Sequence, residues 1–189
     1  MRTTLIVAAL GLALLQLQGC VPLVATGVGA GALMAADRRS SAAYIEDQEI
    51  ELRAGKRIGD AFPKDTHVNV TSFNHDVLIT GEVPSAEAQQ KITDIAQGVG
   101  NVRKVYNQTV VGPVSLFSSR SNDAYITTKV KGRFLDAKRF QVNYVKVVTE
   151  DGVVYLMGLV TAQEAADAAQ LASTTSGVRK VVTLFQIVQ

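Results

Sequence analysis

The sequence predicts an α+β fold made of two tandem copies of one αββαβ unit. A strand-like run carrying Gly81 recurs with Gly158 at the same place, 77 residues later. The segment V-R-K-V at 102–105 recurs at 178–181, an offset of 76 residues. Between these landmarks the hydrophobic period changes from helical to extended in the same order in both copies. We expect each copy to form a three-stranded mixed sheet packed on two helices.

Each copy opens with a helix, which the apolar spacing predicts over about 46–60 and again over 122–137. A strand follows at 67–73 and 142–149, and a two-residue turn leads into a second strand at 76–83 and 153–160. The turns are Asn74-His75 and Asp151-Gly152, and Asp-Gly is the stronger signal because a type I′ turn needs two positive φ angles. A second helix covers 85–97 and 161–174, and a last strand ends each copy. Of these two helices only the later one has a complete capping box, formed by Thr161 and Glu164.

The segments around the repeat predict a leader, a tether and a linker. We expect a signal peptide at 1–19, a lipidated tether at 20–43, a first domain at 44–111, a linker at 112–121 and a second domain at 122–189. The linker contains Gly, Pro and four serines, as interdomain segments do. Residues 21–36 carry no charge and are rich in Ala and Gly. This composition predicts a flexible tether. The alternative is a helix that packs on another helix through the small residues Gly27 and Gly31, which stand four positions apart.

The N-terminus has the pattern of a bacterial lipoprotein leader. Arg2 is followed by an uncharged run whose apolar centre, residues 5–15, has the length of a secretory signal and is short for a membrane span. The residues Leu17, Gln18 and Gly19 precede Cys20 and resemble a lipobox. That resemblance implies a diacylglyceryl group on the Cys20 sulfur, cleavage before Cys20 and acylation of the new amine. An uncleaved signal anchor and an ordinary signal peptide are the alternatives.

Cys20 is the only cysteine of the 189 residues, so an exported chain has no internal disulfide and no thiolate cluster. Several acyl chains on one residue give stable anchoring, at roughly 0.8 kcal/mol per buried methylene. Beyond this covalent lipid no cofactor is expected. The resemblance to sorted lipoproteins implies that an aspartate after the lipidated cysteine would mark retention in the inner membrane, and Val21 stands there instead. We therefore expect the chain on the periplasmic face of the outer membrane.

The repeat resembles a known family. Two αββαβ copies, each with a glycine in an inner strand, look like a pair of BON domains. The terminal G-V-x-x-V element of that family is present at 177–181, and at 100–105 with one residue inserted. With the lipobox in front, the whole chain is similar to the dual BON-domain outer-membrane lipoproteins. The resemblance implies a non-enzymatic protein that supports envelope integrity, including at the division site, and binds anionic phospholipid through the first helix of the second domain.

The charges of the two leading helices differ in sign. Residues 46–62 hold five acidic and three basic side chains, a net charge of −2, whereas residues 122–139 hold two acidic and five basic, a net charge of +3. At about 100° per residue, Ile126, Val130, Phe134 and Ala137 share one arc and are expected to face the sheet. The opposite arc is expected to face out, and an aromatic and a leucine among basic residues are typical of an interfacial membrane helix. The predicted lipid-binding residues are Tyr125, Thr128, Lys129, Lys131, Gly132, Arg133 and Leu135.

Glu49 stands in the first copy where Tyr125 stands in the second, so the sequence predicts lipid binding by the second domain alone. The expected partners are anionic phospholipids such as phosphatidylglycerol or cardiolipin. In one alternative, Tyr125 and Leu135 pack between the two copies. In another, the acidic first copy, expected to lack an exposed aromatic on its leading helix, makes the chain an adaptor for periplasmic envelope or cell-wall proteins.

The residues offer little for catalysis. His67 and His75 lie at opposite ends of one predicted strand, about 25 Å apart, so they do not share a metal and are read as strand-start and turn residues. The glycines at 27–31 follow no strand, which argues against a dinucleotide loop. After removal of the leader the chain carries 18 basic and 17 acidic groups and lies outside the cytoplasm, so nucleic acid is not an expected partner.

Overall fold

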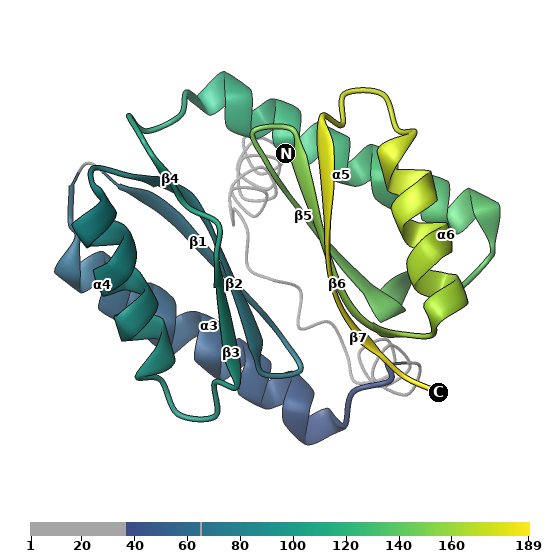
Figure 1. Cartoon of the computed structure of the whole chain (residues 1–189), viewed down its shortest axis with the longest axis horizontal. Helices are drawn as coiled ribbons and strands as arrows, with labels where there is room; N and C mark the ends of the chain where they lie inside the picture. Colours follow the sequence, from purple (N-terminus) through teal and green to yellow (C-terminus); the bar gives the residue numbers. More distant parts are fainter. Residues whose placement is uncertain (1–36, 65) are drawn as a thin grey trace, which may run out of the picture. The chain divides into compact units, whose positions relative to one another are not determined.

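The computed structural model describes residues 37–64 and 66–189, which belong to one compact unit. Cys20, the leader and residues 21–36 lie outside the described residues. The first copy of the repeat comprises α3 (Ser41–Ala61), β1 (His67–Phe73), β2 (Asp76–Val83), α4 (Ala86–Gln97), β3 (Lys104–Asn107) and β4 (Val110–Val111). The second comprises α5 (Phe117–Ala137), the 3₁₀ turn η2 (Val142–Tyr144), β5 (Val145–Glu150), β6 (Val153–Val160), α6 (Ala162–Ser173) and β7 (Lys180–Ile187). The predicted α+β class and order of elements are confirmed (Figure 1).

Both sheets are mixed, as predicted. In each copy a hairpin pairs the first two strands antiparallel, and the last strand returns parallel to the inner one. The first sheet has four strands where three were expected, because its last strand is interrupted and resumes as β4, which also pairs with β2. The interruption follows from Asn107, whose side chain accepts hydrogen bonds from the backbone N–H of Thr109 at 3.0 Å and from its hydroxyl at 2.7 Å.

The turns and caps follow the sequence closely. Asp151 and Gly152 both have positive φ, 46° and 69°, as a type I′ turn requires, and Asn74 and His75 adopt the same geometry at 49° and 68°. The predicted capping box of α6 is present, with Thr161 and Glu164 each bonding the other's backbone N–H. Local sequence therefore determines the ends of these hairpins and of α6.

The leading helices begin earlier than predicted. α3 starts at Ser41, where the Ser40 hydroxyl caps the N–H of Ala43, and α5 starts at Phe117, inside the segment expected as a linker. The serines of that segment suggested a loop. They are nevertheless compatible with a helix, and the Arg120 guanidinium steadies its first turn by donating to the Ser115 carbonyl at 3.0 Å.

The glycine repeated in the inner strands is required by close backbone approach. A Cβ on Gly81 would overlap the carbonyl oxygen of His67 in β1, and Gly81 also has a φ of +115°. A Cβ on Gly158 would likewise overlap the carbonyl oxygen of Tyr144, which precedes β5. Any side chain at either position would push the neighbouring strand away.

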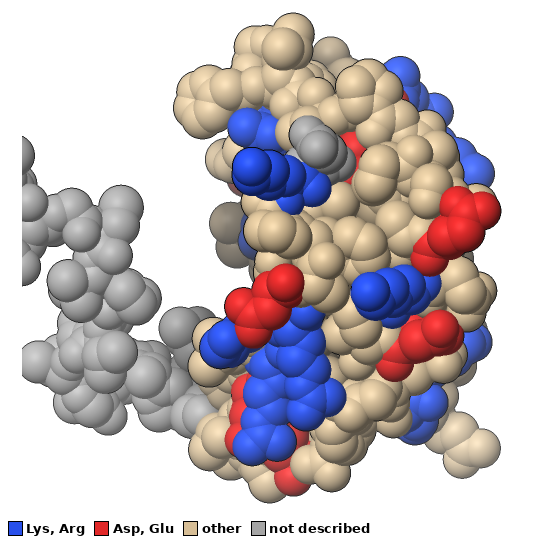
Figure 2. All heavy atoms as spheres, turned by 90° about the vertical axis from the view of Figure 1, so that its left-hand side faces the viewer, with Lys and Arg blue, Asp and Glu red and all other residues tan. Residues whose placement is uncertain are grey.

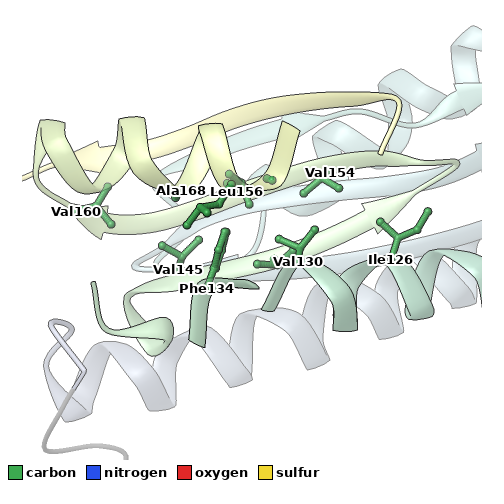
Figure 3. Packing of buried hydrophobic residues seen from close by; sticks show 11 residues of the cluster. Ile126, Val130, Phe134, Val145, Val154, Leu156, Val160 and Ala168 are labelled. Carbon is green, nitrogen blue, oxygen red and sulfur yellow. The ribbon is translucent and has the colours of Figure 1, made fainter. Parts of the chain in front are cut away.

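Each copy has its own apolar core between its helices and one face of its sheet. In the second copy Ile126, Val130 and Phe134 of α5 are at most 1% exposed and pack against β5, β6 and α6 (Figure 3). Ala137 packs at the edge of this cluster, so the predicted inward arc of the helix is confirmed. The corresponding core of the first copy is built on Ile50, Ala54 and Ile58.

The opposite faces of the two sheets contribute to a third apolar cluster. Phe73 and Leu78 from the first sheet join Tyr155 and Met157 from the second. Polar contacts border this cluster, including Asn74 Nδ2 to Gln186 Oε1 at 2.7 Å and Asn69 Nδ2 to Glu150 Oε2 at 3.1 Å. Burial raises the pKa of the Glu150 carboxyl, against the lowering effect of the Asn69 hydrogen bond. The two copies are thus joined through their sheets.

The first described residues attach to both copies. The Arg38 guanidinium donates to the two carboxylate oxygens of Glu164 at 2.5 and 2.9 Å and to the Leu159 carbonyl at 3.0 Å. It also lies 3.9 Å from the centre of the Tyr144 ring. The neighbouring Arg39 pairs with Asp47 of α3 at 2.8 Å. Although it precedes the first copy in sequence, this segment is therefore bound to the second copy as well.

Candidate functional site

The leading helix of the second copy, α5, presents a buried face and an exposed face. Its outward residues include Tyr125 and Leu135, which are 62% and 61% exposed. Thr128 and Lys131 are also exposed, and Gly132 is partly so. These fractions exclude the alternative in which Tyr125 and Leu135 are buried between the two copies, since other residues fill that junction.

Sequence reasoning missed a second aromatic on this face. Phe117 is 78% exposed and Leu116, the residue before the helix, is 75% exposed. At about 100° per residue, Phe117 falls within about 80° of Tyr125 and in line with Leu135. Its spacing of eight residues before Tyr125 was the available signal, but residues 112–121 had been assigned to a linker. We call Phe117, Tyr125, Thr128, Gly132 and Leu135 together the outer face of α5. From Phe117 to Leu135 it is about 27 Å long at ~1.5 Å per residue.

The predicted basic residues lie along the borders of this face, and two of the three have side chains fixed by hydrogen bonds. The Lys129 ammonium donates to the carbonyl of Ser176 and lies 5.2 Å from the Tyr125 ring centre. Arg133 donates to the Leu171 carbonyl and the Thr174 hydroxyl, both at 2.8 Å, near the end of α6. Lys131 is exposed. The helix therefore holds two of its positive charges in fixed positions and presents a third to solvent.

One of the two acidic residues counted on this helix is withdrawn from its surface. Asp123 is 5% exposed, and its carboxylate accepts the backbone N–H groups of Asp151 and Gly152 at 2.9 and 2.8 Å. Only Asp136 then remains as an exposed acid against five basic residues between 122 and 139. With Asp123 buried, the exposed charged side chains between residues 122 and 139 are therefore predominantly basic.

The equivalent face of α3 differs in chemistry. Glu49 forms an ion pair with Arg53 at 2.5 Å, and Ile45 and Leu52 beside it are 61% and 72% exposed. The expectation that this helix lacks an exposed aromatic is wrong for Tyr44, which is 37% exposed because α3 starts before it. The Arg39 guanidinium lies 4.9 Å from the centre of that ring. On the side of the molecule that includes α4, acidic side chains lie among the basic ones (Figure 2).

Both histidines take the places expected of them. His67 is the first residue of β1, and His75 lies in the hairpin turn with its Nε2 2.6 Å from a carboxylate oxygen of Glu46. Within residues 37–64 and 66–189, none of the helices combines the length and apolar character that crossing a bilayer requires.

Comparison with known proteins agrees with the repeat. The model of the BON domain matches residues 46–113 and again residues 122–189. The chain belongs to the BON-domain family. The two BON domains correspond to the two αββαβ copies, and the first turn of α5, with Phe117, precedes the matched range of BON domain 2.

Three relatives are similar over most of the chain. The outer membrane lipoprotein DolP of Haemophilus influenzae is 37% identical over 90% of this chain and 89% of its own length. The 21 kDa hemolysin of Actinobacillus pleuropneumoniae is 31% identical over 81% of this chain and 80% of its own. The osmotically-inducible protein Y of Escherichia coli is 30% identical over 62% of this chain and 60% of its own. The predicted class, a dual BON-domain lipoprotein of the outer membrane, is confirmed, and this family is in general non-enzymatic.

Proposed function

We propose that this lipoprotein binds anionic phospholipid through the outer face of α5 in BON domain 2, and in this way supports the integrity of the envelope, including at the division site. The observation that carries the proposal is the row of exposed apolar side chains, Phe117, Tyr125 and Leu135, on a helix whose surface is cationic. An amphipathic helix with aromatic and basic residues lies in the interface of a bilayer, with its apolar residues among the headgroups.

The energetics fit a weak, local interaction. Each basic residue near an anionic surface contributes about 1 kcal/mol, and burial of exposed apolar area adds about 25 cal/mol per Å². Such an affinity alone would leave the protein free for much of the time. A lipid on Cys20 raises the local concentration of α5 at the membrane, so that a weak contact suffices to select the lipid environment.

The test is flotation of the fragment 37–189, the compact unit that holds all three apolar clusters, with phosphatidylglycerol or phosphatidylcholine vesicles. We expect salt-sensitive binding to phosphatidylglycerol only, and we expect Tyr125→Glu to abolish it. Leu52→Glu is the matched control, because Leu52 lies in BON domain 1 at the position of Thr128 and is 72% exposed. Binding that Tyr125→Glu leaves intact would contradict the proposal.

A second candidate, an adaptor that docks envelope proteins, rests on the exposed Ile45 and Leu52 of α3. The charged residues beside Ile45 and Leu52 on α3, Glu49 and Arg53, pair with each other, so this face carries no excess positive charge that would favour an anionic membrane. Photo-crosslinking from position 52 in the whole chain tests it. Specific protein adducts at position 52, together with failure of the vesicle assay, would favour the adaptor role.

A further inference from the structure

Three potential ligand residues meet where the two BON domains join. His67 begins β1, Glu82 is its cross-strand partner in β2, and Glu150 ends β5 of the other domain. One ligand atom from each lies within 4.8 Å of the other two. Sequence reasoning looked only for a second histidine near His67 and so missed carboxylates from two other strands, one of them in the other copy.

One ligand atom of this group, the Nδ1 of His67, is buried and makes no hydrogen bond within the described residues. Across residues 37–64 and 66–189, three buried side-chain atoms make no hydrogen bond: His67 Nδ1, Thr80 Oγ1 and Ser115 Oγ. The Thr80 hydroxyl lies close enough to the Glu150 carboxyl to lower its pKa as a hydrogen-bonding neighbour, and the backbone N–H of Ser115 donates to Glu82 at 3.1 Å. Because buried polar atoms in native proteins are normally satisfied, the unpaired His67 Nδ1 beside two carboxylates indicates a partner from outside the chain.

The distances suit a metal ion better than a direct contact. His67 Nδ1 lies 3.4 Å from Glu82 Oε2 without a hydrogen bond between them. Two ligands bound at about 2.1 Å to a tetrahedral zinc ion stand about 3.4 Å apart. Second contacts also orient both carboxylates: Ser115 donates to Glu82, and Asn69 donates to Glu150 at 3.1 Å.

The charge and the access at this point agree with a cation. Two carboxylates from different domains face each other at the edge of the sheets, where an unneutralised pair would repel. A cavity of about 360 Å³ opens beside them, and its wall includes His67, Asn69 and Glu150 as well as Arg120, whose guanidinium donates to the Ser115 carbonyl. An ion therefore has a route to the ligands from solvent.

We infer that His67, Glu82 and Glu150 bind a divalent transition metal ion of the zinc class at the junction of the two BON domains. One imidazole and two carboxylates are a donor set that zinc accepts, and water completes the coordination. The ion links two strands of domain 1 to one strand of domain 2, and so adds a metal-dependent connection to the apolar cluster that already joins the two sheets.

The test is calorimetric titration of the chelator-treated, lipidated whole chain in detergent with zinc chloride. We expect one zinc ion per chain, and we expect cobalt(II) to give the visible absorption of a tetrahedral centre. His67→Ala and Glu150→Gln should each weaken zinc binding by at least about tenfold. His75→Ala is the matched control, because His75 pairs with Glu46 in the hairpin turn and should leave zinc binding unchanged.

Thermal unfolding distinguishes lost ligation from lost folding. His67→Ala and Glu150→Gln should both unfold cooperatively without zinc. Zinc should raise the melting temperature of the wild type and of His75→Ala, but not that of the two ligand variants. Absence of stoichiometric zinc binding to the wild type would overturn the inference. Zinc binding that survives both His67→Ala and Glu150→Gln would overturn it equally.

Discussion

Asp47 and Asp123, 76 residues apart, occupy the same place in the two BON domains, and each binds the hairpin turn of its own sheet. Asp123 accepts the N–H groups of Asp151 and Gly152, and Asp47 accepts those of Asn74 and His75 at 2.7 and 2.9 Å. Both are buried, at 5% and 0% exposure. In each domain a carboxylate from the leading helix thus accepts two backbone N–H groups of the hairpin turn that have no acceptor within the turn.

We predict that Asp123→Ala lowers the free energy of unfolding by about 2–3 kcal/mol, because it leaves two backbone N–H groups without their acceptor. Urea denaturation of the fragment 37–189 measures the change. The matched control is Asp136→Ala on the exposed side of the same helix, expected within about 0.5 kcal/mol of wild type. Equal effects of the two substitutions would show that the turn does not depend on Asp123.

The glycines of the repeat give a second prediction. Gly158→Ala should destabilise BON domain 2 by several kcal/mol, because the added Cβ overlaps the Tyr144 carbonyl and moves β5 away from β6. Gly132→Ala in α5 meets nothing within 4 Å and should stabilise by about 0.5–1 kcal/mol through helix propensity. Melting curves of the two variants should therefore move in opposite directions.

Phe117 provides a prediction specific to the proposed lipid contact. Phe117→Ser should weaken flotation with phosphatidylglycerol vesicles severalfold, because the ring is 78% exposed and lies on the outer face of α5. The same change should leave the unfolding midpoint of the fragment unaltered, since the ring is outside the core clusters. If vesicle binding were unaffected, the contact would be confined to the part of α5 after its first turns.

The Arg38–Glu164 pair gives a prediction on pH. The hydrogen bond from Arg38 lowers the pKa of Glu164, so this contribution to stability is complete above the ordinary carboxyl range. This contribution is lost as the pH falls through the lowered pKa that the Glu164 carboxyl has in the folded protein. Glu164→Gln should therefore be less stable than wild type at neutral pH, and the difference should shrink toward pH ~3. An Arg38→Ala background, in which that difference is already small at neutral pH, is the control.

Much of this fold was accessible from sequence because the repeat supplied two readings of each element. The strands, the type I′ turns, the α6 capping box and the inward arc of α5 all followed from local pattern. Failures arose where tertiary contacts override local signals. The serines before Asn122 suggested a loop, yet α5 begins at Phe117, and Asp123 was counted as surface charge although it binds a turn.

The two candidate sites also differ in how far the sequence could predict them. The exposed positions of Tyr125 and Leu135 followed from helical periodicity, a property of one element. The grouping of His67 with Glu82 and Glu150 depends on a hairpin register and on the packing of two sheets, which no single segment encodes.

The attachment of Arg38 to Glu164, Leu159 and Tyr144 determines how the protein responds to tension from its lipidated end. A pull transmitted through the N-terminal segment would reach the corner of β6 and α6 together with the start of α3. Both domains would then move as one body, and thermal motion of the membrane anchor would not by itself separate them.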